Sequence, residues 1–379
     1  MKMNSIKLFS LITVFVLTTA CNSGNTEKPS GAYKAPEGAE SKIELIASVA
    51  MDVQYPTPIG FIETENTENI YYLTLDNPQI ISVNLTLDEI DTTELVGGEN
   101  MVVISYAYNA SSGQLLVQMT SKDSATSIQV DSVIAAYTLD GKKQWEKECA
   151  NYISFVSFGD NWCYLDGANL CIVDSRWNMV KLITLPSKNY SINRITDDGI
   201  FLFENITNEG STSWYSVSID WEGNILDKEA TLAFYNPCLL SEGNDRYVIA
   251  NNENGELVVY EQSETGINKQ ITIVHFSSEA CSFTPTAAVA KDEYNYVFGT
   301  MTETDDETAD EGNAYLLQLD RNWNFIDACE IPIEDNKKII GAFVRENRLL
   351  ISVCENGVSS IIGTISSGQQ LFEVYNVIL

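Results

Sequence analysis

Basic residues and histidine are scarce in this chain of 379 residues. It contains 22 lysines and arginines against 53 aspartates and glutamates, and its formal net charge is −31. A protein of that charge is repelled by nucleic-acid phosphates and by anionic lipid headgroups, which argues against nucleic acid as a partner. Hydrophobic residues still make up 44% of the chain, so the acidity indicates an acidic globular surface and not a disordered polyanion.

The chain has one histidine, His275, and this limits the chemistry available to it. Catalysis by Ser-His-Asp or Cys-His groups needs a histidine beside the nucleophile, and His275 follows the strand-like run ITIV, where a structural role is the simpler interpretation. The absence of a Cys-x-x-Cys pair and of a glycine-rich phosphate loop argues against conventional zinc and phosphate sites. We therefore assign no catalytic residue. A glycosidase built on two carboxylates stays open, because 53 acidic residues always offer some pair.

Only one long apolar run is present, and it stands near the start of the chain. Two lysines precede or border this run, which covers residues 8–17, and small residues lead from it to Cys21. The pattern is typical of a secretory signal, because the run is too short to span a bilayer. The stretch Leu17-Thr18-Thr19-Ala20-Cys21 also resembles the lipobox of bacterial lipoproteins. That resemblance implies cleavage before Cys21 and a lipid on its thiol, whereas ordinary cleavage near Ala20 with a free thiol is the alternative.

The sequence divides into three segments. Residues 1–20 are the predicted lipoprotein signal peptide, and residues 21–42 are a lipidated cysteine and a flexible tether, since 22–42 lack large aliphatic residues and are rich in Gly, Pro, Ser and Glu. Residues 43–379 are predicted to form one domain. Acyl chains on Cys21 would hold that domain at a membrane surface, so we expect it to be extracytoplasmic, in the cell envelope, and attached to the membrane through the lipid alone.

From residue 43 onward, short alternating or β-branched runs are separated by clusters of Gly, Asn, Asp and Ser, which predicts an all-β fold. One hairpin recurs seven times: an apolar strand, a turn at Asp or Ser with Gly or Asn, and a second strand. The copies are spaced about 46 residues apart on average. The turn residues that align them are Asp88, Asp140, Asp174, Asp220, Ser263, Asp320 and Ser366.

Seven copies at this spacing predict a β-propeller of seven four-stranded blades, although eight blades would also fit. A β-sandwich would contain many short strands as well, but it would not repeat the same hairpin at this interval. Two strands precede each hairpin, for instance IIGAFV and RLLISV before SSIIGTI in the last copy. The run KIELIASVA, residues 42–50, is expected to close the ring by pairing with the last blade.

Residues 137–145, YTLDGKKQW, resemble the hairpin of pyrroloquinoline-quinone-type propeller repeats, in which a tryptophan follows an Asp and Gly turn and docks between blades. The other copies keep the turn but not the tryptophan at this position, so the resemblance covers one blade well. The chain is also similar to WD-like repeat propellers and to the propeller modules of bacterial lipoproteins. These resemblances imply scaffolding or ligand binding without catalysis, and they imply no cofactor.

Aromatic residues recur in the predicted interblade loops, on the face where propellers most often bind partners. Aromatic faces bury area at little entropic cost, so such residues could stack on a sugar or grip a peptide; packing of each ring under its own loop is the alternative. We predict a monomeric, non-catalytic binding or scaffold module for a protein or carbohydrate of the cell envelope. A glycoside hydrolase for envelope or host glycans and an assembly factor for envelope proteins are the alternatives. The candidate ligand-binding residues are Tyr55, Tyr152, Tyr190, Tyr235 and Phe276.

The loop TETDDETADEGN, residues 302–313, carries six acidic side chains. A solvated loop is the ordinary interpretation of such a run. Calcium is the alternative, with Asp305, Asp306 and Asp310 as candidate ligands, although their spacing is not that of an EF-hand loop. No other metal or cofactor is expected.

Seven cysteines follow Cys21, and this odd number leaves at least one of them unpaired. Most lie in strand-like runs, where cysteine behaves as a small buried hydrophobe. Cys163 and Cys171 flank a turn around Gly167 and could approach one another to form a disulfide. A disulfide directly across neighbouring strands is usually strained, so free thiols are the alternative.

Overall fold

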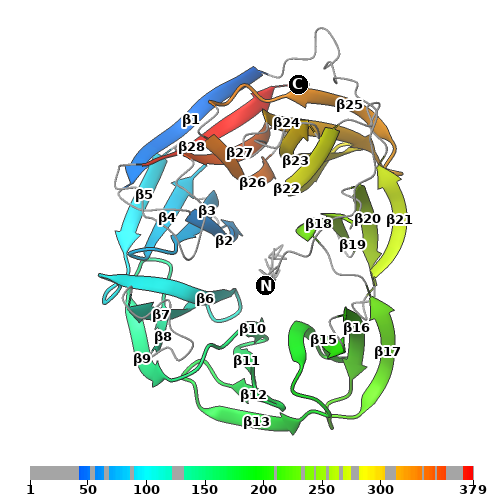
Figure 1. Ribbon diagram of the computed structural model, residues 1–379. Helices are drawn as coiled ribbons and strands as arrows, with labels where there is room; N and C mark the ends of the chain where they lie inside the picture. Colours follow the sequence, from blue (N-terminus) through cyan, green and yellow to red (C-terminus); the bar gives the residue numbers. More distant parts are fainter. Residues whose placement is uncertain are drawn as a thin grey trace, which may run out of the picture.

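Figure 1 shows the strands of the computed structural model gathered into seven blades around a central axis. Each blade is an antiparallel sheet of four strands. The described residues form 28 strands and no helix. None of the described segments is therefore a helix long and apolar enough to cross a membrane. The predicted all-β propeller with seven blades is confirmed. The structure describes residues 42–51, 56–63, 68–85, 89–121, 132–208, 211–231, 235–242, 245–252, 256–263, 268–274, 281–303, 313–334, 337–345, 348–355 and 370–378.

In the first three blades the strands follow one another in sequence from the axis to the rim (Figure 1). Blade 1 comprises β2 (Pro56–Glu63), β3 (Glu68–Thr74), β4 (Gln79–Asn84) and β5 (Glu89–Glu94). Blade 2 comprises β6 (Met101–Asn109), β7 (Gln114–Ser121), β8 (Ser132–Tyr137) and β9 (Lys143–Cys149). Blade 3 comprises β10 (Phe155–Phe158), β11 (Asn161–Asp166), β12 (Asn169–Val173) and β13 (Met179–Thr184).

The next three blades are built in the same order. Blade 4 comprises β14 (Tyr190–Thr196), β15 (Gly199–Asn208), β16 (Ser211–Ile219) and β17 (Ile225–Thr231). Blade 5 comprises β18 (Tyr235–Glu242), β19 (Asp245–Asn251), β20 (Leu257–Gln262) and β21 (Asn268–Val274). Blade 6 comprises β22 (Cys281–Lys291), β23 (Tyr294–Glu303), β24 (Asn313–Asp320) and β25 (Phe325–Glu330).

Blade 7 joins the two ends of the described chain. Its strands are β26 (Lys337–Arg345), β27 (Arg348–Glu355), β28 (Gln370–Ile378) and, at the rim, β1 (Lys42–Met51). The expected closure by residues 42–50 is therefore confirmed, with pairing from Lys42 and Ile378 to Met51 and Gln370. The prediction that SSIIGTI follows RLLISV as the third strand of blade 7 is wrong, because β27 pairs with β28. Residues 359–365 lie outside the described residues. Because β1 supplies the fourth strand, the last repeat needs only three strands of its own.

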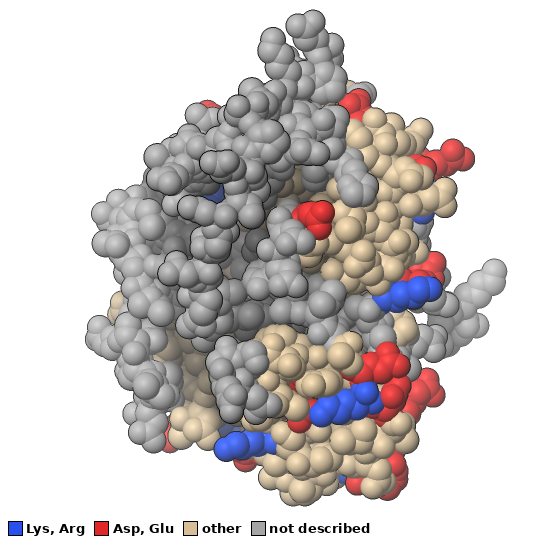
Figure 2. All heavy atoms as spheres, turned by 45° about the vertical axis from the view of Figure 1, so that its right-hand side comes forward, with Lys and Arg blue, Asp and Glu red and all other residues tan. Residues whose placement is uncertain are grey.

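The hydrophobic core lies in layers between neighbouring blades. The second strand of blade 2, β7, is buried along seven of its eight residues, whereas the rim strand of blade 3, β13, buries only one residue of six. A middle strand is apolar on both faces because each blade packs against two neighbours. One layer joins blades 2 and 3 through Leu116, Ile134, Phe155 and Trp162. The described charges at the rim are scattered, with lysine and arginine among the acids, as Figure 2 shows for one side of the molecule.

The recurring turn between the third and fourth strands has a defined hydrogen-bond pattern. In blade 3, Asp174 accepts hydrogen bonds from the backbone N–H groups of Arg176 and Asn178 and from the Asn178 amide, at 2.8 to 2.9 Å. These bonds hold the pKa of Asp174 below its ordinary value. Asp220 and Asp320 make the same contacts in blades 4 and 6.

The predicted alignment is wrong by two residues in blade 2. The backbone of Thr138, not of Asp140, pairs with the residue four positions later, Lys142, as Asp174 pairs with Asn178. The Thr138 hydroxyl donates to the Asp140 carboxylate and to the carbonyl of Lys142, so the turn forms without an aspartate in first place. The fourth residue of this turn has a positive φ in all four blades. It is Gly141, Trp177, Gly223 or Trp323.

Candidate functional site

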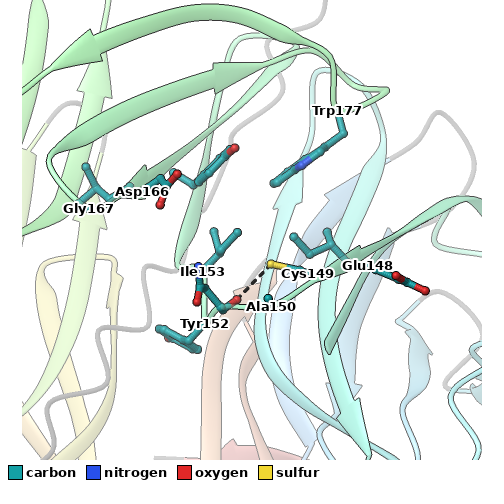
Figure 3. A pocket seen from close by; sticks show the side chains of 12 residues that line it. Glu148, Cys149, Ala150, Tyr152, Ile153, Asp166, Gly167 and Trp177 are labelled. Carbon is teal, nitrogen blue, oxygen red and sulfur yellow. Dashed lines mark hydrogen bonds between the residues drawn. The ribbon is translucent and has the colours of Figure 1, made fainter. Parts of the chain in front are cut away.

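Antiparallel strands place two kinds of connection at the same end of the ring. These are the loop from the fourth strand of one blade to the next blade and the turn between the second and third strands. We call this end the loop face. A pocket of about 410 Å³ opens there between blades 2 and 3 (Figure 3), and we call it the interblade pocket. Its lining residues are Ile134, Glu148, Cys149, Ala150, Asn151, Tyr152, Ile153, Tyr164, Leu165, Asp166, Gly167 and Trp177.

The loop that lines the pocket, residues 150–154, is tied to blade 2 by one buried amide. Gln118 of β7 donates to the carbonyl of Asn151 at 2.7 Å and accepts from the backbone N–H of Ile153 at 2.9 Å. The same amide donates to the Ser132 hydroxyl, which in turn donates to the carbonyl of Cys149. An unmade hydrogen bond at a buried group costs about 1–3 kcal/mol, so Gln118 fixes the path of this loop.

One wall of the pocket is aromatic. The rings of Tyr164 and Trp177 are stacked, with centroids 5.1 Å apart and 8° between their planes. Trp177 also contacts Trp145 of blade 2 and meets the edge of Phe155. The Trp145 indole donates to the carbonyl of Ser175 at 2.7 Å, so Trp145 does dock between blades, as its resemblance implied. The wall is thus rigid before any ligand arrives.

Polar groups lie beside Tyr164 in the pocket. Burial raises the pKa of the Tyr164 hydroxyl, and the neighbouring Cys171 thiol and Asp166 carboxylate raise it further, so the phenol stays protonated. The Cys149 thiol donates to the carbonyl of Asn151 at 3.1 Å (Figure 3). Figure 3 also shows Glu148 directed away from the cavity, on the wall opposite Asp166. Of the two carboxylates, Asp166 is therefore the one available to a ligand.

The structure separates the aromatic residues that the sequence singled out. Tyr152 lies in the interblade loop, lines the pocket and is 55% exposed, and its hydroxyl is hydrogen-bonded to Ser105 of β6. Tyr190 begins β14 and packs, half-buried, into the layer between blades 3 and 4. Tyr235 begins β18, and its side chain is not described. Tyr55 and Phe276 lie outside the described residues.

Sequence reasoning missed Tyr164, Asp166 and Trp177. Tyr164 and Asp166 lie in β11, and Trp177 lies in a turn at the opposite end of the blade. The positive φ of Trp177, +64°, differs from the usual backbone conformation of a bulky residue. A sequence signal did exist, since Trp177 stands in the turn position that Gly141 and Gly223 occupy in other blades.

The predicted metal candidates and the histidine cannot be placed. Asp305, Asp306, Asp310 and His275 all lie outside the described residues. Within the described ranges, no group of three His, Cys, Asp or Glu side chains is arranged to hold a metal ion.

The suggested disulfide between Cys163 and Cys171 is not formed. Cys163 pairs across the sheet with Ile172, whereas Cys171 pairs with Tyr164. Neighbouring positions along a strand alternate between faces, so the two thiols point to opposite sides of blade 3. Cys163 packs toward blade 4, and Cys171 is hydrogen-bonded to Tyr164 on the side of blade 2. Among the described residues, the cysteines that form no disulfide are Cys149, Cys163, Cys171, Cys238, Cys329 and Cys354.

Comparison with known proteins supports the fold and gives no family. No protein-family model matches the chain, and no curated protein matches it. The WD40 domain of Neurospora crassa Pan2 is similar in structure, with a TM-score of 0.52 and 9% identity over 90% of this chain and 97% of that domain. The chain is a seven-bladed propeller, and a WD40 domain is among its structural neighbours.

Two further solved structures are less similar. The β-propeller domain of Myceliophteria thermophila Cps50 (Swd1) has a TM-score of 0.46 and 12% identity, covering 80% of this chain and 92% of that one. An endosialidase of phage phi92 has a TM-score of 0.46 and 8% identity, covering 90% of this chain and 70% of that one. At such scores and identities the likeness says nothing about activity.

Proposed function

We propose that this chain is a lipid-anchored, extracytoplasmic β-propeller that binds a protein or carbohydrate partner on its loop face, with the interblade pocket as its principal binding site. The observation that carries this proposal is the pocket itself. Its volume of about 410 Å³ falls in the range of small-molecule sites, and a rigid aromatic wall stands beside a few polar groups. Such a combination fixes the orientation of a ligand at little entropic cost.

Binding is favoured over glycoside hydrolysis by the placement of the acids. A glycosidase needs two carboxyl groups that face the same bond, about 5–9 Å apart. In the interblade pocket Glu148 and Asp166 stand on opposite walls, and Glu148 is directed away from the cavity (Figure 3). The pocket therefore offers a ligand one carboxylate, which suits recognition more than bond cleavage.

The anchor is proposed from the sequence, because residues 1–41, Cys21 among them, lie outside the described residues. The strand directions give this proposal a geometric consequence. β1 begins at Lys42 beside Ile378, at the end of blade 7 opposite the loop face. A tether attached there would leave the loop face directed away from the membrane. A flexible chain of this length spans about 25 Å on average, enough to keep the domain clear of the headgroups.

Affinity capture of envelope components tests the proposed function. The bait is the chain without residues 1–20 and with Cys21→Ser, which is free of lipid. We expect one or more components to be retained by this protein and lost with the pocket variant Tyr152→Ala/Asp166→Asn. The matched control is Asp160→Asn, because Asp160 is an exposed aspartate of the same blade at the opposite end. Equal capture by the pocket variant would refute the assignment of the site.

A further inference from the structure

We infer that the interblade pocket takes an organic cation, namely a primary ammonium or guanidinium group carried on a flexible chain. This inference rests on the proposed function, because it names the ligand class of that binding site. The group could belong to a lysine or arginine side chain of a partner protein or to a free polyamine. The recognition chemistry is the same in both cases.

The local charge favours a cation. None of the twelve lining residues is a lysine, an arginine or a histidine. Asp166 is exposed on the pocket wall and forms no ion pair with any described residue. An ammonium or guanidinium group would give this carboxylate a charge-assisted hydrogen bond, which is about twice as strong as a neutral one.

The aromatic groups act in the same direction. A cation near the face of an aromatic ring is attracted by the ring quadrupole. Trp177, Tyr164 and Tyr152 all line the pocket. The protonated phenol of Tyr164 presents its oxygen as an additional acceptor beside Asp166. The aromatic rings and the carboxylate of Asp166 therefore both favour positive charge in the pocket.

The whole molecule adds a long-range contribution. A net charge of −31 lowers the potential around the protein and raises the local concentration of cations. A neutral sugar could use the aromatic wall, but it would gain nothing from this field or from the charge of Asp166. A metal ion fits less well, because no group of three suitable ligands exists among the described residues.

Equilibrium titration of the full chain with four probes tests the inference. The probes are the peptide acetyl-Gly-Lys-Gly-amide, the same peptide with an acetylated lysine side chain, cadaverine and a neutral chito-oligosaccharide. We expect the lysine peptide to bind at least about tenfold more tightly than its acetylated form, and more weakly as salt rises. Tighter binding of cadaverine than of the peptide would indicate a free polyamine as the source, and the reverse would indicate a protein segment.

Alkylation of Cys149 locates the bound probe. Cys149 lines the pocket and is half-buried, while Cys329, also half-buried, lies in blade 6 and serves as an internal control. We expect the lysine peptide to slow the alkylation of Cys149 and not that of Cys329. Asp166→Asn, which keeps the side-chain shape, should weaken peptide binding about tenfold, whereas Asp160→Asn should leave it unchanged.

Three results would overturn the inference. They are equal binding of the acetylated peptide, unchanged binding by Asp166→Asn, and failure of every cationic probe to protect Cys149. Protection by the oligosaccharide alone would refute the cation while leaving the binding module in place. The capture experiment decides the proposed function separately, because it does not depend on which probe is used.

Discussion

Tyr164 and Trp177 lie with their rings parallel, 5.1 Å apart at the centroids, although they come from opposite ends of blade 3. Trp177 reaches this position with a φ of +64°, a conformation that costs a non-glycine residue about 1–3 kcal/mol. Such a cost persists only where the surrounding packing compensates it. The contacts with Tyr164, Trp145 and Phe155 provide that compensation and bring an aromatic ring to the pocket.

Trp177→Gly would relieve the backbone and remove the ring at the same time. Loss of a large packed aromatic costs about 3–5 kcal/mol, so a net loss of about 2–3 kcal/mol in the free energy of unfolding is expected. Denaturant unfolding measures it, and Trp177→Phe should lose less. An unchanged free energy of unfolding for the glycine variant would show that the ring contributes no net packing.

Gln118→Leu removes the amide that holds the interblade loop. The backbone groups of Asn151 and Ile153 then lose their partner, and the free energy of unfolding should fall by about 1–3 kcal/mol. The loop should also open more often, so that alkylation of Cys149 becomes faster. Gln270→Leu, at an exposed position of β21, is the matched control. Identical alkylation rates in the two variants would argue against the role of Gln118.

Two buried thiols predict how stability depends on alkaline pH. Burial raises the pKa of Cys163 and that of Cys238 to about 12, from an ordinary value of 9.0. Above pH 9 the unfolded chain releases these protons while the folded chain retains them. The stability contributed by each thiol is therefore complete below pH 9 and is lost as the pH rises toward 12.

Cys163→Ala should flatten this dependence. Between pH 9 and 10 the wild type should lose about 1 kcal/mol more than the variant, as measured by urea unfolding across that interval. Cys238→Ala should behave in the same way. Parallel pH profiles for wild type and both variants would contradict the predicted burial of these thiols.

Closure of the ring by β1 can be tested at its one buried described side chain. Ala47 pairs with Val374 and is 8% exposed. Ala47→Asp places an unpaired charge at this buried position, and the free energy of unfolding is expected to fall by about 3 kcal/mol or more. Thermal unfolding and limited proteolysis report the opening of blade 7. Ala50→Asp, at an exposed position of the same strand, should have little effect. Equal Tm values for the two variants would count against closure.

The lipid anchor is tested at Cys21. Cys21→Ala should abolish lipidation and shift the protein from the membrane fraction to the soluble fraction, because one modified cysteine is the proposed attachment. Fractionation and mass spectrometry of the mature N-terminus give the result. A variant that stays membrane-associated and is processed at the wild-type rate would eliminate the lipoprotein hypothesis.

The sequence predicted the blades well because their signal is repeated. Seven hairpins indicate the same architecture, so an alignment error in one copy does not change the predicted fold. Blade 7 shows the limit: SSIIGTI and QLFEVYNV are both apolar and β-branched, and only the place of β1 at the rim decides which strand pairs with β27. Strand propensity carries no information about such a long-range choice.

Of the aromatic residues that line the pocket, sequence reasoning singled out Tyr152 alone, for a related reason. The position of Tyr152 on the loop face could be predicted, because the repeat spacing alone places its segment in an interblade loop. Tyr164 reads as an ordinary strand residue, and its face follows from the register of β11 with its neighbours. Trp177 has a positive φ, which is unusual for a tryptophan, and its sequence signal is indirect: it aligns with Gly141 and Gly223 in the turns of other blades. Side-chain direction at such positions is set by tertiary packing.

Hydrogen exchange of the chain bound to its captured partner tests the central claim most directly. If the interblade pocket is the binding site, exchange should slow at residues 149–153 and 164–167. It should stay unchanged at the turn 220–224 of blade 4, none of whose residues lines the pocket. Protection confined to that turn or to the rim strand β13, with the pocket segments exchanging as in the free protein, would contradict the account.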